Sequence, residues 1–451
     1  MQGGAERALG ALRLSGRGRL RVREARPYGK EGMMRAVRSR LRLWGAEGDA
    51  IIVDTDRPWR LVLWEKAQYV PCWDLGGGSW FSTEWLETHS PESPQCWEPI
   101  MDLACRYSRA AIAESGPARA TVQWDYLLCD NLYRVFRGNS RAQERYHVYP
   151  DGVAVRHLAA WPGDQTAEGL NPTMWEVQEF ILINGAGVDP REQVEPIGFT
   201  LTNLAGDTLE LPYPSKLDDW TSLCSLRPEI AEWSEYIGVV HLRGKPNPFV
   251  AFPRNHLLFP FENCTHCGKP HPQMLAFPRH QNYAHWPATD SADFVGWTVA
   301  KPEDYAKRAT HTSFACCGYH YGGKTPPRPS SWVFLTGAVT QGVEEARRLA
   351  GSWLSPAAVE TSGLFEGYAY RERAYHLRAS KPGPLTVRLS PSRPIVNPVL
   401  RIYRGQPPAA VTWDGEHLGE GEVRTQTSGE DLLIWVNRTL DRATTMGIAQ
   451  R

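Results

Sequence analysis

The chain has 451 residues, and its 50 lysines and arginines equal its 50 aspartates and glutamates. This length exceeds one ordinary hydrophobic core, so the chain forms either two packed domains or a circular array of small sheets. The balanced charge lacks the basic excess of proteins that bind phosphate backbones, so we expect no nucleic-acid partner. No apolar run is long enough for a secretory signal or a membrane span. We therefore expect a cytoplasmic protein without a membrane partner, or a secreted one if a signal peptide has been removed.

Short runs rich in Val, Ile, Trp, Tyr and Phe recur between turn residues along the chain. In order, they cover residues 60–64, 120–128, 145–161, 175–184, 197–204, 236–242, 294–299, 331–339, 385–389, 399–403 and 431–436. Their length and the period-two alternation of several predict antiparallel strands. Residues 343–354 predict a single short surface helix, with acidic residues at its start and a proline beyond its end. An all-β propeller, a large barrel or two sandwiches would all fit this pattern.

The segment Tyr149-Pro-Asp-Gly152 predicts a tight hairpin. Proline presets the first corner, and Gly152 supplies the positive φ of a type I turn followed by a bulge. Pairing outward from this turn places Tyr146 opposite Arg156. The alternation of side chains then gives one face with Glu144, Tyr146 and Arg156 and an opposite face with His147, Tyr149 and His157.

A Cys-x-x-Cys segment gives the strongest metal signal. Cys264 and Cys267 have the spacing of half a tetrahedral zinc site, with His271 close behind. Cys316 and Cys317, or His266, His271 and His320, could complete the site. We expect a structural zinc ion; buried reduced thiols and a catalytic zinc ion are the alternatives.

Several motifs in a fixed order resemble the seven-bladed β-propeller enzymes that include ulvan lyases, rhamnosyl-glucuronate lyases and related α-L-rhamnosidases. The resemblance rests on residues 69–73 (YVPCW), 80–84 (WFSTE), 97–102 (WEPIMD), 105–108 (CRYS), 149–156 (YPDGVAVR), 178–184 (QEFILIN), 248–253 (PFVAFP), 285–287 (HWP), 311–313 (HTS) and 395–398 (IVNP). It implies a propeller with diverged blades. The implied domains are an N-terminal extension with the first strands at 1–50 and a catalytic domain at 51–451 that includes the C-terminal β segment.

The resemblance also implies a polysaccharide lyase that cleaves a glucuronate-containing glycan by β-elimination, without an organic cofactor. Such a reaction needs a cation or donors at the uronate carboxylate, together with a base and an acid. We expect Arg156 to face the carboxylate and Tyr146 to act as acid or base, with Tyr149 and His285 as further catalytic candidates. The expected substrate-binding residues are Trp80, Glu84, His147, Arg279, Gln281 and His311. The 18 tryptophans suit sugar binding and an aromatic core equally well.

The chain departs from these lyases at two places where they carry catalytic histidines. It has Gly76-Gly-Gly-Ser79 at the first place and Gln95-Cys-Trp97 at the second. This departure leaves two alternatives open: a glycoside hydrolase that releases terminal L-rhamnose from glucuronate, and a glycan-binding propeller without catalysis. Glu84, Glu98 and Asp102 are the candidate carboxylates for hydrolysis.

Overall fold

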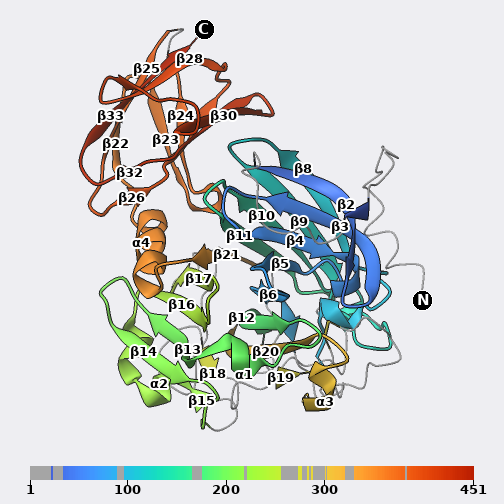
Figure 1. Cartoon of the computed structure of the whole chain (residues 1–451). Helices are drawn as coiled ribbons and strands as arrows, with labels where there is room; N and C mark the ends of the chain where they lie inside the picture. Colours follow the sequence, from blue (N-terminus) through green and yellow to red (C-terminus); the bar gives the residue numbers. More distant parts are fainter. Residues whose placement is uncertain are drawn as a thin grey trace.

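The computed structural model describes residues 22–23, 34–88, 96–164, 175–217, 221–254, 273–276, 282–283, 286–287, 300, 302–319, 330–380 and 383–450. They form two large, mostly antiparallel sheets and a pair of smaller sheets near the C-terminus (Figure 1). The expectation of a mainly β protein with few helices is confirmed. Within these residues, no helix has the length and apolar character of a membrane span.

The first sheet has 12 strands and is built largely from the N-terminal part of the chain. Its main path runs through β1 (Val22–Arg23), β2 (Arg35–Leu43), β3 (Ala46–Asp54), β4 (Arg60–Trp64), β5 (Pro71–Asp74), β6 (Ser79–Ser82), β12 (Trp175–Asn184), β20 (Thr310–Tyr319), β18 (Gln273–Ala276) and β15 (Thr221–Ser222). Two short strands join from the side: β7 (Glu87–Thr88) pairs with β12, and β19 (Asn282–Tyr283) pairs with β20.

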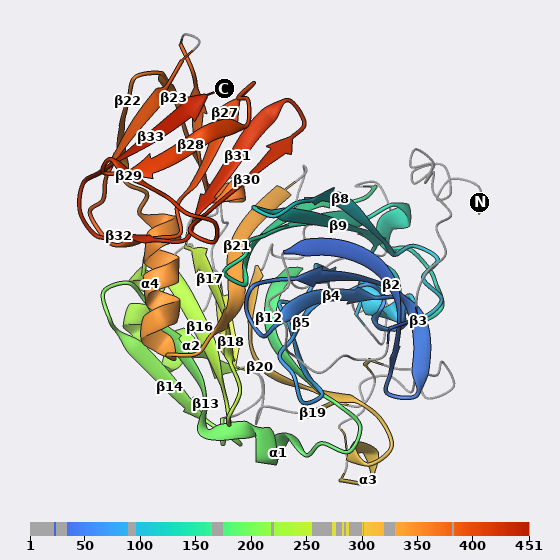
Figure 2. The same ribbon diagram turned by 45° about the horizontal axis from the view of Figure 1, so that its top comes forward.

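The second sheet has nine strands. Their order is β14 (Thr208–Pro212), β13 (Val194–Thr202), β16 (Glu235–Leu242), β17 (Asn247–Pro253), β21 (Ser330–Val339), β11 (Val153–Trp161), β10 (Arg141–Val148), β9 (Ala120–Leu127) and β8 (Arg109–Ser115). Figure 2 shows β8 and β9 running alongside the curved strands β2 to β5 of the first sheet. Trp64 of the first sheet and Trp124 of the second belong to one apolar cluster, so the two sheets share a core.

Strand β12 lies in the middle of the first sheet and is buried at each of its 10 positions. Burial of both faces explains the continuous apolar run at residues 180–183, since a half-exposed strand would alternate. Glu176 and Glu179 precede that run, and both are buried. A charged residue is rarely enclosed without a compensating interaction, so this strand marks a place of special chemistry.

The C-terminal strands form a second β-sandwich with its own core. One sheet contains β22 (Ala358–Thr361), β25 (Leu385–Ser390), β33 (Thr444–Gln450), β28 (Pro408–Trp413) and β29 (Glu416–His417); the other contains β23 (Leu364–Ala369), β24 (Ala374–Arg378), β27 (Val399–Tyr403), β31 (Asp431–Val436) and β30 (Val423–Ser428). A further pair is formed by β26 (Ile395–Val396) and β32 (Thr439–Leu440). The buried ion pair between Arg373 and Asp151, 2.9 Å, ties this sandwich to the β10–β11 hairpin.

The predicted helix is confirmed as α4 (Val343–Leu354), the longest of the described helices. Figure 1 shows α4 between the C-terminal sandwich and the large sheets. Its Ala350 and Trp353 belong to the same apolar cluster as Val239 of β16 and Val396 of β26. The helix therefore packs between two layers, whereas the sequence predicted a surface helix. The other α-helices are single turns: α1 (Pro190–Gln193), α2 (Leu223–Leu226) and α3 (Pro302–Tyr305).

The observed sheets differ from the expected seven-bladed propeller. The described strands run through sheets of 12 and nine members, and they do not divide into separate four-stranded blades. The expected division at residue 50 falls inside β3, and the C-terminal β segment has a core of its own. A propeller and a pair of large sheets use strands of similar length and the same turn residues. The two architectures differ in which distant strands pair, and the sequence pattern does not show that pairing.

The predicted β10–β11 hairpin is confirmed residue by residue. The register pairs Tyr146 with Arg156, His147 with Val155 and Val148 with Ala154. Gly152 has φ +72°, and its amide donates to the carbonyl of Tyr149 at 3.0 Å, as the turn requires. Local turn chemistry therefore fixes this part of the structure.

Replacing Gly152 by alanine tests that turn. A Cβ atom there would overlap the ring nitrogen of Trp59 and approach Cγ of Arg57 to 2.8 Å. Strain at positive φ and the steric overlap should together lower the free energy of unfolding by about 2–4 kcal/mol. Gly206→Ala is the matched control, since Gly206 also has positive φ but open space around it. Urea unfolding of both variants measures the difference; equal losses would contradict the steric argument.

Candidate functional site

Five glutamate side chains are buried in one cluster at the centre of the first sheet. They come from three segments. Glu84 precedes β7 and Glu87 begins it, Glu98 lies two residues after Cys96, and Glu176 and Glu179 are on β12. The exposed fractions of these residues range from 0 % to 7 %. We call these five residues the glutamate cluster.

Two irregularities in strand pairing bring both β12 glutamates into the cluster. The β12–β20 ladder shifts register between Glu176 and Gln178 and again between Glu179 and Ile181. In a regular strand, residues three apart point to opposite faces, and a bulge removes that alternation locally. As a result, Glu176 and Glu179 each act on the same neighbour, Glu84. Such bulges commonly re-aim side chains at functional sites.

Glu84 is the least compensated member of the cluster. It is fully buried, and neither of its carboxylate oxygens has a hydrogen-bond partner within the part of the chain that the structure describes. The charged groups around it are the carboxyls of Glu179, Glu176 and Glu87. Its backbone is in the left-handed region, φ +58°, which is uncommon for a residue with a side chain.

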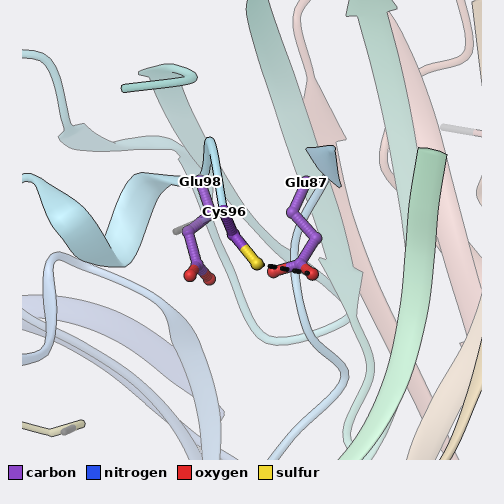
Figure 3. A group of neighbouring side chains, drawn as sticks. All are labelled: Glu87, Cys96 and Glu98. Atoms are coloured by element: carbon purple, nitrogen blue, oxygen red, sulfur yellow. Dashed lines mark hydrogen bonds between the residues drawn. The ribbon is translucent and has the colours of Figure 1, made fainter. Parts of the chain in front are cut away.

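Glu87, Cys96 and Glu98 lie together at the other end of the cluster (Figure 3). The indole nitrogen of Trp85 donates to Glu98 at 2.8 Å and to Glu87 at 3.3 Å. The Cys96 thiol lies 3.5 Å from an oxygen of Glu87. Ligand atoms of this trio all lie within 4.8 Å of one another, and the same is true of Glu84, Glu87 and Glu176. Glu87 thus joins two groups of side chains that could each hold a metal ion.

Burial raises the pKa of three carboxyls in the cluster. Desolvation is the largest cause of the raised pKa at Glu84, Glu98 and Glu179, and repulsion from neighbouring carboxyls adds to it. Within the described residues, none of these three carboxyls forms an ion pair with lysine or arginine. Without a bound cation, the cluster therefore holds protons at pH values where an exposed glutamate has lost them.

Replacing Glu179 by glutamine should remove part of this proton linkage. The folded chain keeps a proton that the unfolded chain releases above the ordinary glutamate pKa of 4.5, so stability falls as pH rises from that value through the raised pKa. Each unit of the raised pKa corresponds to about 1.4 kcal/mol. We expect Glu179→Gln to become progressively more stable than the parent chain between pH 5 and pH 8, measured by urea unfolding with a chelator present.

The exposed residue Glu210 supplies the control for this measurement, since Glu210→Gln should follow the parent chain at every pH. A parallel pH course for Glu179→Gln and the parent chain would mean that Glu179 is ionised in the fold.

The predicted catalytic pair, Tyr146 and Arg156, lies in a buried network beside the glutamate cluster. Arg156 holds Glu144 with two hydrogen bonds of 2.6 and 2.9 Å, and the Tyr146 hydroxyl donates to Glu144 at 3.0 Å. The remaining Arg156 nitrogen donates to the carbonyls of Thr83 and Val177 and to Gln178. Arg156 thus joins the second sheet to the chain segments next to Glu84 and Glu176. A direct role at a substrate stays a prediction for both residues.

The opposite face of the hairpin meets the C-terminal sandwich. The Tyr149 hydroxyl donates to the backbone carbonyl of Glu372, and Nδ1 of His147 lies 2.9 Å from the Thr121 hydroxyl. Burial and the nearby Arg119 lower the pKa of His147 well below its usual value. His147 and Tyr149 therefore occupy the interface with the C-terminal sandwich, on the other side of their strand from Tyr146 and Arg156.

Of the other predicted residues, Trp80 packs against the rings of Trp44 and Trp64. His311 is buried; its Nδ1 donates to the carbonyl of Trp286 at 2.6 Å, and burial lowers its pKa to about 4. The Trp286 ring also contacts Trp85, centroid to centroid 5.2 Å, which connects His311 indirectly to the cluster.

The expected zinc ligands are described only in part. Cys316 is buried on β20, and burial, together with the neighbouring Glu176, raises the pKa of its thiol. Cys317 lies on β20, although only its backbone is described. The other predicted residues Cys264, Cys267, His271, Arg279, Gln281 and His285 lie outside the described residues. The zinc ion stays a prediction.

Sequence reasoning selected Glu84 and Glu98 but missed Glu87, Glu176 and Glu179. It also selected Asp102, which instead accepts hydrogen bonds from the backbone amides of residues 106, 107 and 108 in a turn. An available signal was the acidic residues within the predicted strand 175–184. Two acidic residues inside an apolar strand are unusual enough to mark a site.

The chain matches no family model and no curated protein. Solved structures that it resembles include a putative mutarotase (YeaD) from Salmonella typhimurium, with 12% identity, a TM-score of 0.30, and coverage of 67% of this chain and 94% of that one. Another is galactose 1-epimerase from Lactobacillus acidophilus NCFM, with 10% identity, a TM-score of 0.29, and coverage of 68% and 100%. At such TM-scores, the likeness supports no inference about the site.

The resemblance to the seven-bladed propeller lyases is wrong. The described strands pair into two large sheets of 12 and nine members, which do not divide into propeller blades. The matched motifs are short and rich in aromatic residues, prolines and turn residues. Such segments recur in many β proteins, because strands and turns of any architecture use the same residue types.

Proposed function

We propose that this chain is a carbohydrate-active enzyme of the glycoside hydrolase type, with the glutamate cluster as its catalytic centre. The observation that carries the proposal is the enclosure of five glutamate side chains together, beside tryptophan rings. Glycoside hydrolysis needs one carboxyl group that donates a proton to the leaving oxygen and a second that acts as base or nucleophile. Burial is the usual means by which proteins prepare a carboxyl group for the first role.

Glu98 and Glu179 are the two proton-transfer groups in this proposal. Each is oriented by a donor outside the cluster: Trp85 donates to Glu98, and Ser313 donates to Glu179. Glu98 interacts most strongly with Glu87, whereas Glu179 interacts with Glu176 and Glu84. Glu179 also acts on Glu98, so the two carboxyls lie near enough to act on one bound sugar.

The electrostatics favour a neutral sugar over a uronate at this centre. A glucuronate carboxylate would approach several other carboxyls, and like charges that meet in a buried site repel strongly. Arg156, which was expected to receive a uronate, already binds Glu144 through two nitrogens. Hydrolysis at a neutral glycosyl unit, such as terminal L-rhamnose on glucuronate, therefore fits better than β-elimination. Because the carboxyls are shielded from solvent, turnover also requires a state that admits the sugar.

A parallel assay distinguishes these reactions. The purified protein is incubated with aryl glycosides of neutral sugars, rhamnosyl-glucuronate oligosaccharides, gum arabic and ulvan, while released sugar and absorbance at about 235 nm are followed; hydrolysis releases sugar without an unsaturated product. We expect sugar release alone. Rising absorbance would establish a lyase, and silence with all substrates would remove the support for a glycan-cleaving enzyme.

An epoxide-bearing glycoside provides a second readout that locates the centre. Such a probe esterifies the carboxylate that it reaches, and peptide mass spectrometry identifies the labelled residue. Labelling at Glu98 or Glu179 is the expected result. Labelling of an exposed glutamate such as Glu210 alone would place the chemistry elsewhere.

A further inference from the structure

We propose that Glu84, Glu87 and Glu176 bind a divalent transition-metal cation inside the glutamate cluster. The site is argued from geometry and is separate from the proton-transfer roles of Glu98 and Glu179. A catalytic role for this metal rests on the proposed function. Metal binding itself does not, since it can be measured without any substrate.

The first argument is the arrangement of the donor atoms. One carboxylate oxygen from each of Glu84, Glu87 and Glu176 lies within 4.8 Å of the other two. A metal ion bound by oxygen ligands at about 2.0–2.2 Å separates those ligands by about 3–4 Å, so the observed spacing needs only a small contraction. The three residues come from β7, β12 and the segment between β6 and β7, so pairing in the sheet preforms the site.

The second argument is independent of that spacing. Glu84 is fully buried, and among the described residues the polar groups that surround its oxygens are other carboxyls, with no amide, hydroxyl or cationic partner. A buried carboxylate without a hydrogen-bond donor or counterion is strongly unfavourable, whereas a cation at this position would bind both oxygens. The Glu84 side chain lies beside Glu87 and Glu176, so a cation that compensates its charge would bind between these three carboxyls.

The neighbouring thiols indicate the class of metal. Carboxylates alone suit Mg²⁺ and Ca²⁺, but thiol sulfur favours Zn²⁺ and related transition metals. The Cys96 sulfur is 3.5 Å from Glu87, and the Cys316 thiol contacts Glu176. A site bordered by sulfur on two sides fits Zn²⁺ or Co²⁺ better than Mg²⁺, Ca²⁺ or Mn²⁺. Bound there, the cation would be close to the carboxyls of Glu98 and Glu179, which interact with its ligands Glu87 and Glu176, and would polarise a sugar oxygen.

Metal analysis of the whole chain tests the proposal. The protein is stripped with a chelator and titrated with Zn²⁺, Co²⁺ and Mn²⁺, while bound metal is counted by mass spectrometry and the unfolding midpoint is recorded. Because the expected Cys-x-x-Cys zinc ion would also be counted, the titration is repeated on Cys264→Ser/Cys267→Ser. We expect one equivalent to persist in that variant and the unfolding midpoint to rise with metal concentration.

Two substitutions assign that equivalent to the cluster. Glu84→Gln and Glu176→Gln should each weaken its binding at least about tenfold, because each removes one charged ligand. Glu210→Gln, on the exposed strand β14, is the charge-matched control and should bind as the parent chain does. Both cluster variants remain assessable if activity is lost, since bound metal and the unfolding midpoint need no turnover.

Absence of any bound equivalent in the Cys264→Ser/Cys267→Ser chain, or unchanged affinity in both Glu84→Gln and Glu176→Gln, would overturn the metal site. Sugar release by the stripped protein alongside such a result would leave the proposed function standing. Metal binding without activity on any glycan would support the metal site and remove the support for the proposed function.

Discussion

Glu98→Gln is expected to lower kcat for glycoside cleavage by about 10²–10⁴-fold, the usual contribution of a general acid or base. Glutamine has the same shape and can still accept the hydrogen bond from Trp85, but it has no proton to donate to the leaving group. The loss should therefore appear in kcat, with little change in KM. The free energy of unfolding should not fall, because the raised pKa of Glu98 makes its carboxyl a cost to folding above the ordinary glutamate pKa. Steady-state kinetics on an aryl glycoside measures the loss in kcat.

The leaving group provides an internal control for this variant. A substrate whose phenol leaves without protonation needs no general acid, so Glu98→Gln should lose much less activity on it than on a poor leaving group. Equal losses on both substrates would assign Glu98 to the nucleophile or base instead. Activity within a factor of about three of the parent chain on both would place the chemistry away from Glu98.

Arg156→Met is expected to destabilise the fold by about 3–5 kcal/mol, because it leaves the buried Glu144 carboxylate without its counterion. The carbonyls of Thr83 and Val177 lose a donor at the same time. Since these carbonyls lie next to Glu84 and Glu176, Arg156 is a positioning residue for the cluster. Chemical denaturation at pH 7 gives the magnitude.

The double variant Glu144→Gln/Arg156→Met separates a structural role from substrate binding. Removing the buried charge as well should recover much of the lost stability. One of the Tyr126 and Tyr146 hydroxyls can still donate to the glutamine oxygen, and the other can accept from the glutamine amide nitrogen. Recovery of folding together with an unchanged KM for a neutral glycoside supports the structural role. A KM that rises only for uronate-bearing substrates in the refolded double variant would restore Arg156 as a carboxylate ligand.

Local chemistry was readable from the sequence where neighbours along the chain decide the structure. The β10–β11 register follows from one turn, and the bounds of α4 follow from its acidic start and Pro356. The strand β12 was also predicted at its observed bounds, Trp175–Asn184. In each case, the deciding interactions span only a few residues, so alternation, turn residues and end signals are sufficient.

The candidate site could be predicted only in part, because its contacts join residues that are far apart in the sequence. Glu84 and Glu98 could be selected as isolated acidic residues near aromatic motifs, but nothing local shows that Glu98 meets Glu87 or that Glu179 meets Glu84. Those contacts depend on bulges in β12 and on which strand pairs with it. A shift of register by one residue would turn these side chains to the other face of the sheet.

Alternation and turn residues were enough to predict a mainly β protein, many of its strands, the register of one hairpin and one helix. The joining of the strands into two large sheets and a C-terminal sandwich, the packing of α4 between them and the binding of Glu144 by Arg156 became visible only in the folded chain. The difference lies in the range of the interactions. Backbone propensity and turns act over a few residues, whereas sheet order and the burial of charge depend on segments separated by a hundred residues or more, such as β6 and β12 or β12 and β20.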